Sequence, residues 1–152
     1  MKQFIASIFP PTIFKKRTQY AALAAGFWTI IIMLAQLFRF EKFPKTLESL
    51  GIGDGAIAAI AIVLLEFISL PFLLSMPRLS RIERRISGAC TLLAPGVWLV
   101  ISAAVLMSGG QEKVSLFGAV AALPGVASLL LSGAWLAAAA YLTAKLRRLD
   151  LK

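Results

Sequence analysis

The stretch AIAAIAIVLLEFISLPFLLSM, from Ala56 to Met76, decides the fold of this chain. It has 21 residues and one charge, Glu66, near its middle. A helix rises about 1.5 Å per residue, so this segment would be ~31 Å long and would match the hydrocarbon core of a bilayer. A carboxylate at that depth costs roughly 2.5–3.5 kcal/mol on insertion scales. We therefore expect Glu66 to face the interior of a helix bundle.

The rest of the chain has the composition of a membrane protein. Of its 152 residues, 59% are hydrophobic, whereas a soluble domain has about 45–50%. The net charge of +9 would suggest nucleic acid in a soluble protein. Here the basic residues cluster at the ends of apolar stretches, where they set topology and meet anionic lipid. The sequence predicts that lipids are partners and that nucleic acid is not.

Four apolar stretches are long enough to cross a bilayer. We expect an all-α membrane protein, an antiparallel four-helix transmembrane bundle. An interfacial segment at 1–17 would precede it and a basic tail at 146–152 would follow it. The bundle, at 18–145, is expected to have spans at about 18–38, 56–76, 86–107 and 116–142.

The lysines and arginines predict the orientation of the bundle. The two termini and the second loop contain twelve of them, and the first and third loops contain four. Because cytoplasmic loops carry the excess of positive charge, both termini should be cytoplasmic, in a bacterial inner membrane. The main basic anchors are Lys15, Lys16, Arg17, Arg78, Arg81, Arg84, Arg85, Arg147 and Arg148.

Local signals mark several helix ends. Ser80 and Glu83 have the spacing of a capping box, so a helix should begin near residue 81. Asp54 is placed to cap the second span, and Gly51 to end a short helix before it. Pro71 removes one backbone hydrogen bond just after Glu66, which predicts a kink there.

Glu66 is the strongest candidate for a functional residue. An intramembrane carboxylate is by default a site hypothesis, but the same physics fits a neutral glutamate that makes a structural hydrogen bond to a neighbouring helix. No basic residue lies at a matching depth, so we expect Glu66 to be protonated. Its candidate partners are Ser69, one turn along the same face, Gln36 near the outer end of the first span, and Arg39 beyond it.

The contents of histidine and cysteine exclude several kinds of chemistry. The chain has no histidine, which excludes histidine-ligated haem, histidine metal sites and serine–histidine catalysis. No metal site is predicted. The single cysteine, Cys90, cannot form an intramolecular disulfide or a dithiol relay, and we expect it to pack as a small apolar residue. No cofactor is evident, and a redox role would need a bound quinone or the thiols of a partner.

Three tryptophans, Trp28, Trp98 and Trp135, lie inside the expected spans and not at their edges. We expect them to pack in the core. A pocket for a flat ring is the alternative interpretation.

The run LAQLFRFEKFPKTLESLGI (34–52), a glycine-rich turn and then AIAIVLLEFISLPFLL (59–74) resemble the first half of the DoxX/MauE membrane family. The resemblance covers about residues 20–76, and Pro71 departs from the small residues usual at its position. It implies four spans, with Glu66 as the family's glutamate in the second span and Arg39 or Lys42 in its cationic position. It also implies an accessory role in membrane redox or thiol chemistry, which is quinone-linked in some members.

Three function classes follow. The first is a redox-associated or complex-accessory subunit of the DoxX/MauE kind. The second is a small proton-coupled transporter that uses Glu66, although the strong charge bias argues against the dual insertion known among small multidrug transporters. The third is a purely structural subunit or assembly factor. Other membrane subunits or further copies of the chain would be partners, and the sequence leaves open whether the chain catalyses a reaction.

Overall fold

Four long helices and one short helix make up most of the part of the chain that the structure describes. This computed structural model describes residues 17–74, 76, 79–107, 113–114, 116–117, 120–121 and 123–150. It confirms an all-α, antiparallel four-helix bundle, to which a hairpin of two very short strands is added. The elements are α2 (Arg17–Phe38), α3 (Phe43–Ser49), α4 (Gly55–Leu73), α5 (Arg81–Met107), β1 (Lys113–Val114), β2 (Leu123–Pro124) and α6 (Gly125–Asp150).

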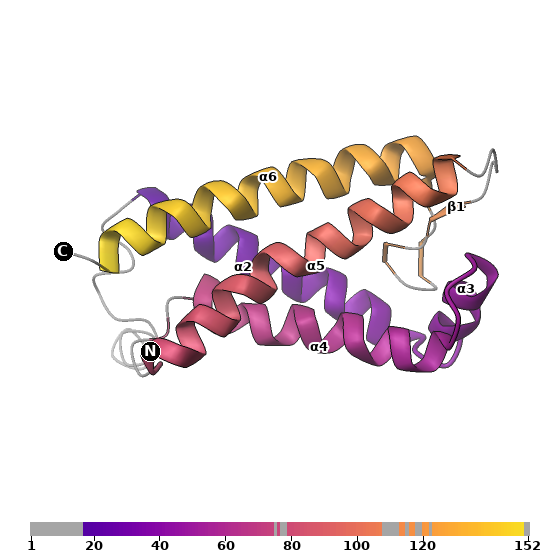
Figure 1. The fold of residues 1–152 in the computed structure, drawn as a ribbon, viewed down its shortest axis with the longest axis horizontal. Coiled ribbons are helices and arrows are strands. Elements are labelled where there is room, and N and C mark those ends of the chain that lie inside the picture. Colours follow the sequence, from indigo (N-terminus) through magenta and orange to yellow (C-terminus); the bar gives the residue numbers. More distant parts are fainter. Residues whose placement is uncertain are drawn as a thin grey trace, which may run out of the picture.

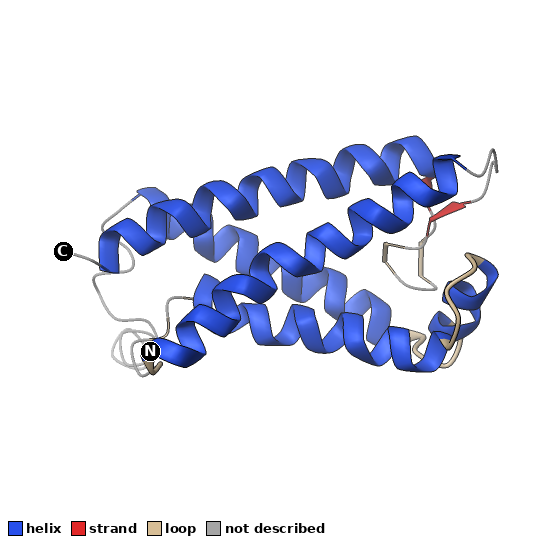
Figure 2. Ribbon diagram, in the orientation of Figure 1, coloured by secondary structure: helices blue, strands red, loops and turns tan. Residues whose placement is uncertain are grey.

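The four long helices form a closed ring. α2 packs on α4 and on α6, and α5 packs on the same two helices, so that α2 and α5 lie diagonally across the ring. α5 runs obliquely from the end of α4 to the start of α6 (Figure 1). The start of α2 and the end of α6 lie at one end of the bundle, and α3 and the strand pair lie at the other (Figure 2).

The interior of the bundle is rich in polar groups, and its outer surface is apolar. Each of the four long helices is long and apolar enough to cross a membrane. Phe27, Ile57, Val100 and Leu130 are all more than half exposed on the outside. Lipid solvates such side chains and water does not, so these are the features of a multi-pass membrane protein. The buried polar residues are Thr29, Gln36, Glu66, Ser69, Ser87, Thr91, Ser102, Ser128, Ser132 and Thr143.

The structure confirms the helix-end signals of the sequence. Asp54 accepts hydrogen bonds from two amides in the first turn of α4, at 3.0 and 3.1 Å. Gly51 has a φ of 80° and follows the end of α3. At the start of α5, the Ser80 hydroxyl accepts from the Glu83 amide at 3.2 Å, and the Glu83 carboxylate accepts from the Ser80 amide at 2.7 Å. This reciprocal pair is the expected capping box.

The capping box leads to a prediction about the start of α5. Ser80→Ala removes the acceptor for the Glu83 amide and should cost about 1 kcal/mol of local helix stability. Hydrogen exchange should therefore become faster at the amides of Ile82 and Glu83. Unchanged exchange at both amides would contradict the assignment of the cap.

The last span differs from the sequence expectation in its start. The expected span begins at about residue 116, but α6 begins at Gly125. Leu116 and Phe117 form a turn, and β2 pairs with β1 before α6 starts. Pro124 lacks an amide hydrogen and therefore fits the position just before the helix. Leu116 is nevertheless fully buried against the bundle. The apolar residues around Leu116 therefore belong to a buried connection and not to the last span.

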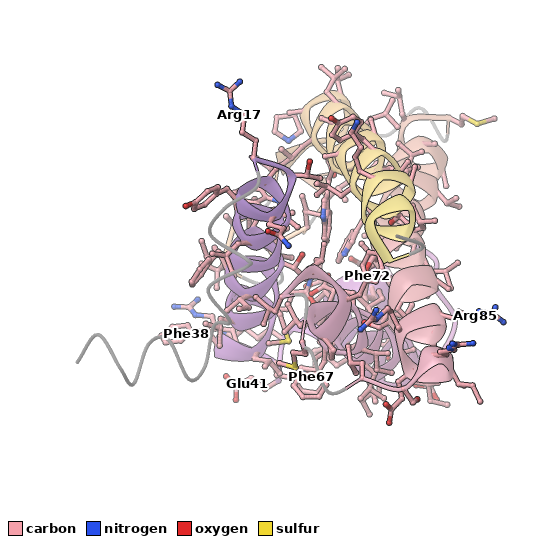
Figure 3. The ribbon with its side chains drawn as sticks, turned by 90° about the vertical axis from the view of Figure 1, so that its left-hand side faces the viewer. Arg17, Phe38, Glu41, Phe67, Phe72 and Arg85 are labelled. Carbon is pink, nitrogen blue, oxygen red and sulfur yellow. The ribbon has the colours of Figure 1, made fainter. Side chains whose placement is uncertain are left out.

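Basic residues gather at the end of the bundle where α2 begins and α5 begins. Arg17, Arg81 and Arg85 are exposed there, and Arg84 is half-buried. Figure 3 views the molecule from this end and shows Arg17 and Arg85 on different sides of it. α6 runs to the same end through Arg147 and Arg148, while Lys15, Lys16 and Arg78 lie outside the described residues.

This distribution makes the orientation testable. The positive-inside rule predicts that the basic end is cytoplasmic and that the α3 end is outside. Topology reporters fused at Gly53 and after Lys152 should report opposite sides of the membrane. The same side for both fusions would contradict the three spans, α4, α5 and α6, that lie between them.

Candidate functional site

Glu66 lies inside the bundle, with none of its surface exposed. From α2, Gln36 Nε2 donates a hydrogen bond to Glu66 Oε1 at 2.9 Å. From α5, Trp98 Nε1 donates to the same oxygen at 3.2 Å. We call these three residues, Gln36, Glu66 and Trp98, the Glu66 cluster. It joins α2, α4 and α5 through side chains alone, and it brings together two of the candidates expected from the sequence, Glu66 and Gln36.

A second hydrogen bond fixes the orientation of the Gln36 amide. Gln36 Nε2 also donates to the backbone oxygen of Leu116, at 3.2 Å. In the same turn, the Phe117 ring meets Trp28 edge-on, with the centroids 6.0 Å apart. The connection between α5 and α6 is therefore tied to α2 at two points. Because both acceptors face the amide nitrogen, turning the amide over would lose both bonds.

Two buried acceptors of the Glu66 cluster have no hydrogen-bond partner among the described residues. They are Glu66 Oε2 and Gln36 Oε1. An ionised carboxylate could only accept, so it would leave both atoms unpaired at a considerable cost in free energy. A proton on Oε2 supplies the donor that the cluster lacks. The arrangement therefore favours a protonated Glu66, which stays a prediction.

Ser69 shares the buried face of Glu66 but does not bind its carboxylate. The Ser69 hydroxyl donates to the backbone oxygen of Glu66, at 2.7 Å. Its own backbone oxygen accepts from Ser87 at 3.3 Å and from Thr91 at 3.5 Å, both in α5. Ser69 is thus part of the contact between α4 and α5, and the role of carboxylate partner expected for it is wrong.

α4 continues through Pro71 to Leu73, with support from α5. The Ser87 hydroxyl accepts a hydrogen bond from the Phe72 amide, at 2.9 Å. A proline disturbs the backbone hydrogen bonds around it, and a hydroxyl from a neighbouring helix can take up a freed group. Pro71 is accommodated because Ser87 lies opposite it.

Arg39 and Lys42 do not take part in the cluster. Both side chains are exposed beyond or near the end of α2, whereas Glu66 is enclosed. No described residue forms an ion pair with Glu66. Arg39, a candidate partner of Glu66 from the sequence, therefore does not pair with it directly.

Trp98 is the member of the cluster that is not among the partners expected for Glu66 from the sequence. Its side chain is fully buried and stacks on Phe43 of α3, with the ring centroids 6.2 Å apart. The expectation of core packing is correct, but the indole also has a polar function. A buried indole N–H usually needs an acceptor, and among the described residues Glu66 is the one buried carboxylate. The need of a buried indole for an acceptor, together with the presence of Glu66, is the feature of the sequence that could have predicted this hydrogen bond.

α5 and α6 are held together by hydroxyl groups as well as by apolar packing. The Ser102 and Ser128 hydroxyls lie 2.8 Å apart, and Ser102 also donates to the Trp98 backbone oxygen at 2.7 Å. This chain of bonds leads from α6 to the residue that binds Glu66. Cys90 is buried in α5 and is not bonded to another cysteine.

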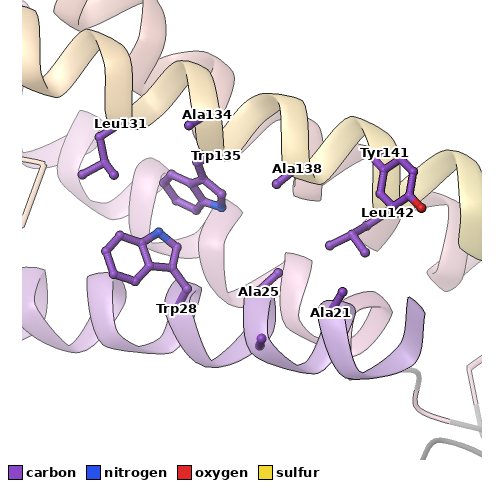
Figure 4. A pocket seen from close by; sticks show the side chains of 10 residues that line it. Ala21, Ala25, Trp28, Leu131, Ala134, Trp135, Ala138, Tyr141 and Leu142 are labelled. Carbon is purple, nitrogen blue, oxygen red and sulfur yellow. The ribbon is translucent and has the colours of Figure 1, made fainter. Parts of the chain in front are cut away.

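A lateral cavity of about 360 Å³ lies between α2 and α6, and we call it the α2–α6 groove. Trp28 and Trp135 project into it from the two helices and face each other (Figure 4). Towards the basic end it is bounded by small residues of both helices and by Tyr141. The groove does not include a member of the Glu66 cluster. The remaining lining residues are Ala21, Ala24, Ala25, Leu131, Ala134, Ala138 and Leu142.

Comparison with protein-family models, with curated proteins and with solved structures gives no match to this chain. Within the described residues, no group of three or more histidine, cysteine, aspartate or glutamate side chains is arranged to hold a metal ion.

Proposed function

We propose that this protein is an accessory subunit of a membrane redox complex, of the kind that its resemblance to DoxX/MauE proteins implies. The observation that carries the proposal is the enclosure of Glu66, which binds α2 and α5 at once. In this proposal the Glu66 cluster is a protonated structural joint that sets the shape of the subunit.

Enclosure of Glu66 argues against the proton-coupled transporter. A carrier of that kind must open its carboxylate to each side of the membrane in turn. Here an opening would break the bonds from Gln36 and Trp98 and separate Leu116 from α2. Buried hydrogen-bonded groups of this kind favour one rigid arrangement.

The redox chemistry itself would belong to a partner subunit in this proposal. The chain has one cysteine and so cannot form a dithiol pair by itself. Electrons would pass through a quinone or through the thiols of the partner. The exposed apolar sides of the four helices are available for contact with lipid or with such a subunit.

Purification of the tagged chain from its own membranes in a mild detergent tests the proposal. We expect a membrane oxidoreductase to co-purify in fixed proportion and to lose turnover when this chain is deleted. Glu66→Gln should restore that turnover, because glutamine keeps the hydrogen bonds of a neutral acid.

The contrary result is equally specific. In that case, the purified chain alone in liposomes would dissipate a pH gradient, contrary to our expectation, and Glu66→Gln would abolish this dissipation. That outcome would show a proton-coupled transporter and would contradict the proposal.

A further inference from the structure

The α2–α6 groove has the size and shape of a site for a chain-like apolar ligand. Its volume of about 360 Å³ falls in the range of ~300–1,000 Å³ that is usual for ligand pockets. Its lining extends from Ala21 to Trp28 on α2 and from Leu131 to Leu142 on α6, which corresponds to ~10–16 Å along the helices. The lining therefore extends along both helices, and the groove lies on the side of the bundle.

Basic side chains lie next to one end of this groove. Arg17 precedes Ala21 by one helical turn on α2, and Lys145 follows Tyr141 by one turn on α6, so each shares a face with a lining residue. Both side chains are exposed. α2 contains no acidic residue, and α6 contains only Asp150. The apolar groove thus continues into a positively charged surface at the basic end of the bundle.

We propose that the α2–α6 groove binds an acyl chain of an anionic phospholipid, with the phosphate headgroup between Arg17 and Lys145. The charge selects an anionic headgroup over a zwitterionic one, and the Trp28 and Trp135 rings contact the far part of the chain. In other membrane proteins, basic sites between transmembrane helices bind anionic headgroups by the same electrostatics. Each basic residue near the membrane surface raises the affinity about fivefold. The proposal does not depend on the role of Glu66.

Tryptophan quenching by brominated acyl chains tests the proposal directly. The full-length protein is reconstituted in phosphatidylcholine vesicles that contain a small fraction of dibrominated phosphatidylglycerol or, in parallel, of dibrominated phosphatidylcholine. Trp28 and Trp135 report on the groove, and the fully buried Trp98 supplies an unquenched baseline. Two contacts of about fivefold each predict a preference for phosphatidylglycerol of about twenty-fivefold.

Single substitutions locate the site. Arg17→Gln and Lys145→Gln should each lower the preference about fivefold. Arg85→Gln is the matched control, because Arg85 is exposed at the same end of the bundle but belongs to α5. It should leave the preference unchanged. Ala138→Phe fills the groove from an exposed position and should reduce quenching by both lipids.

Several results would overturn the proposal. Equal quenching by the two brominated lipids would show an ordinary lipid annulus. A preference that survives Ala138→Phe would place the lipid outside the groove. Absence of quenching by either lipid would show that a second copy of the protein covers the groove. A purified protein that retains a quinone and excludes brominated lipid would assign the groove to a different ligand.

Discussion

Trp98→Ala should destabilise the protein by about 3–5 kcal/mol, the usual range for removal of a fully buried tryptophan. The substitution leaves a cavity next to Phe43 and removes the donor to Glu66 Oε1. Unfolding in mixed detergent micelles, followed by circular dichroism, measures the free energy of unfolding relative to the unmodified protein.

Trp98→Phe separates the two effects. It keeps a six-membered aromatic ring but deletes the pyrrole ring with its N–H. Its cost should lie below that of Trp98→Ala and should include about 0.5–1.5 kcal/mol for the hydrogen bond. Equal costs for the alanine and phenylalanine variants would mean that the hydrogen bond dominates. A cost below 1 kcal/mol for Trp98→Ala would contradict the central, packed position of Trp98.

Substitution of Glu66 should separate charge from hydrogen bonding. Glu66→Gln should leave stability nearly unchanged, because an amide oxygen can accept from Gln36 and Trp98 while its nitrogen donates. Glu66→Leu has an apolar side chain that suits the surrounding bundle. It leaves the Trp98 N–H and one Gln36 N–H without an acceptor, at about 1–3 kcal/mol for each orphaned donor.

The matched control for the leucine variant is Glu41→Leu. Glu41 is exposed beyond the end of α2 (Figure 3), so this substitution should change stability by no more than about 0.5 kcal/mol. The same unfolding assay applies to all three variants. If Glu66→Leu were as stable as the unmodified protein and Glu66→Gln were not, the cluster would not act through neutral hydrogen bonds.

Much of the fold follows from the sequence, because local signals and span lengths agree. The apolar stretch that starts at Ala56 forms α4, and its cap on Asp54 is where the side-chain chemistry predicts it. The start of α6 could not be predicted from the sequence. An apolar connection around Leu116 has the composition of a span, and only tertiary structure shows that it folds back onto α2.

The site is predictable in part. Depth and residue type identify Gln36 as a partner of Glu66, since both lie on buried faces of adjacent helices. Helical spacing places Ser69 on the correct face but cannot say which oxygen its hydroxyl meets. Trp98 depends on how α5 crosses α4, which no local pattern determines. The relation to DoxX/MauE proteins rests on the sequence runs alone and stays a proposal.

The central claim is that Glu66 is a neutral, enclosed acid that joins three helices. Infrared difference spectroscopy of the protein in lipid, with Glu66→Gln as the reference, tests it most directly. We predict the carbonyl band of a protonated carboxyl group at neutral pH, absent from the glutamine variant and slow to shift on transfer to deuterated water. A carboxylate band at neutral pH that titrates like free glutamate would contradict the account, because it would place Glu66 in contact with water.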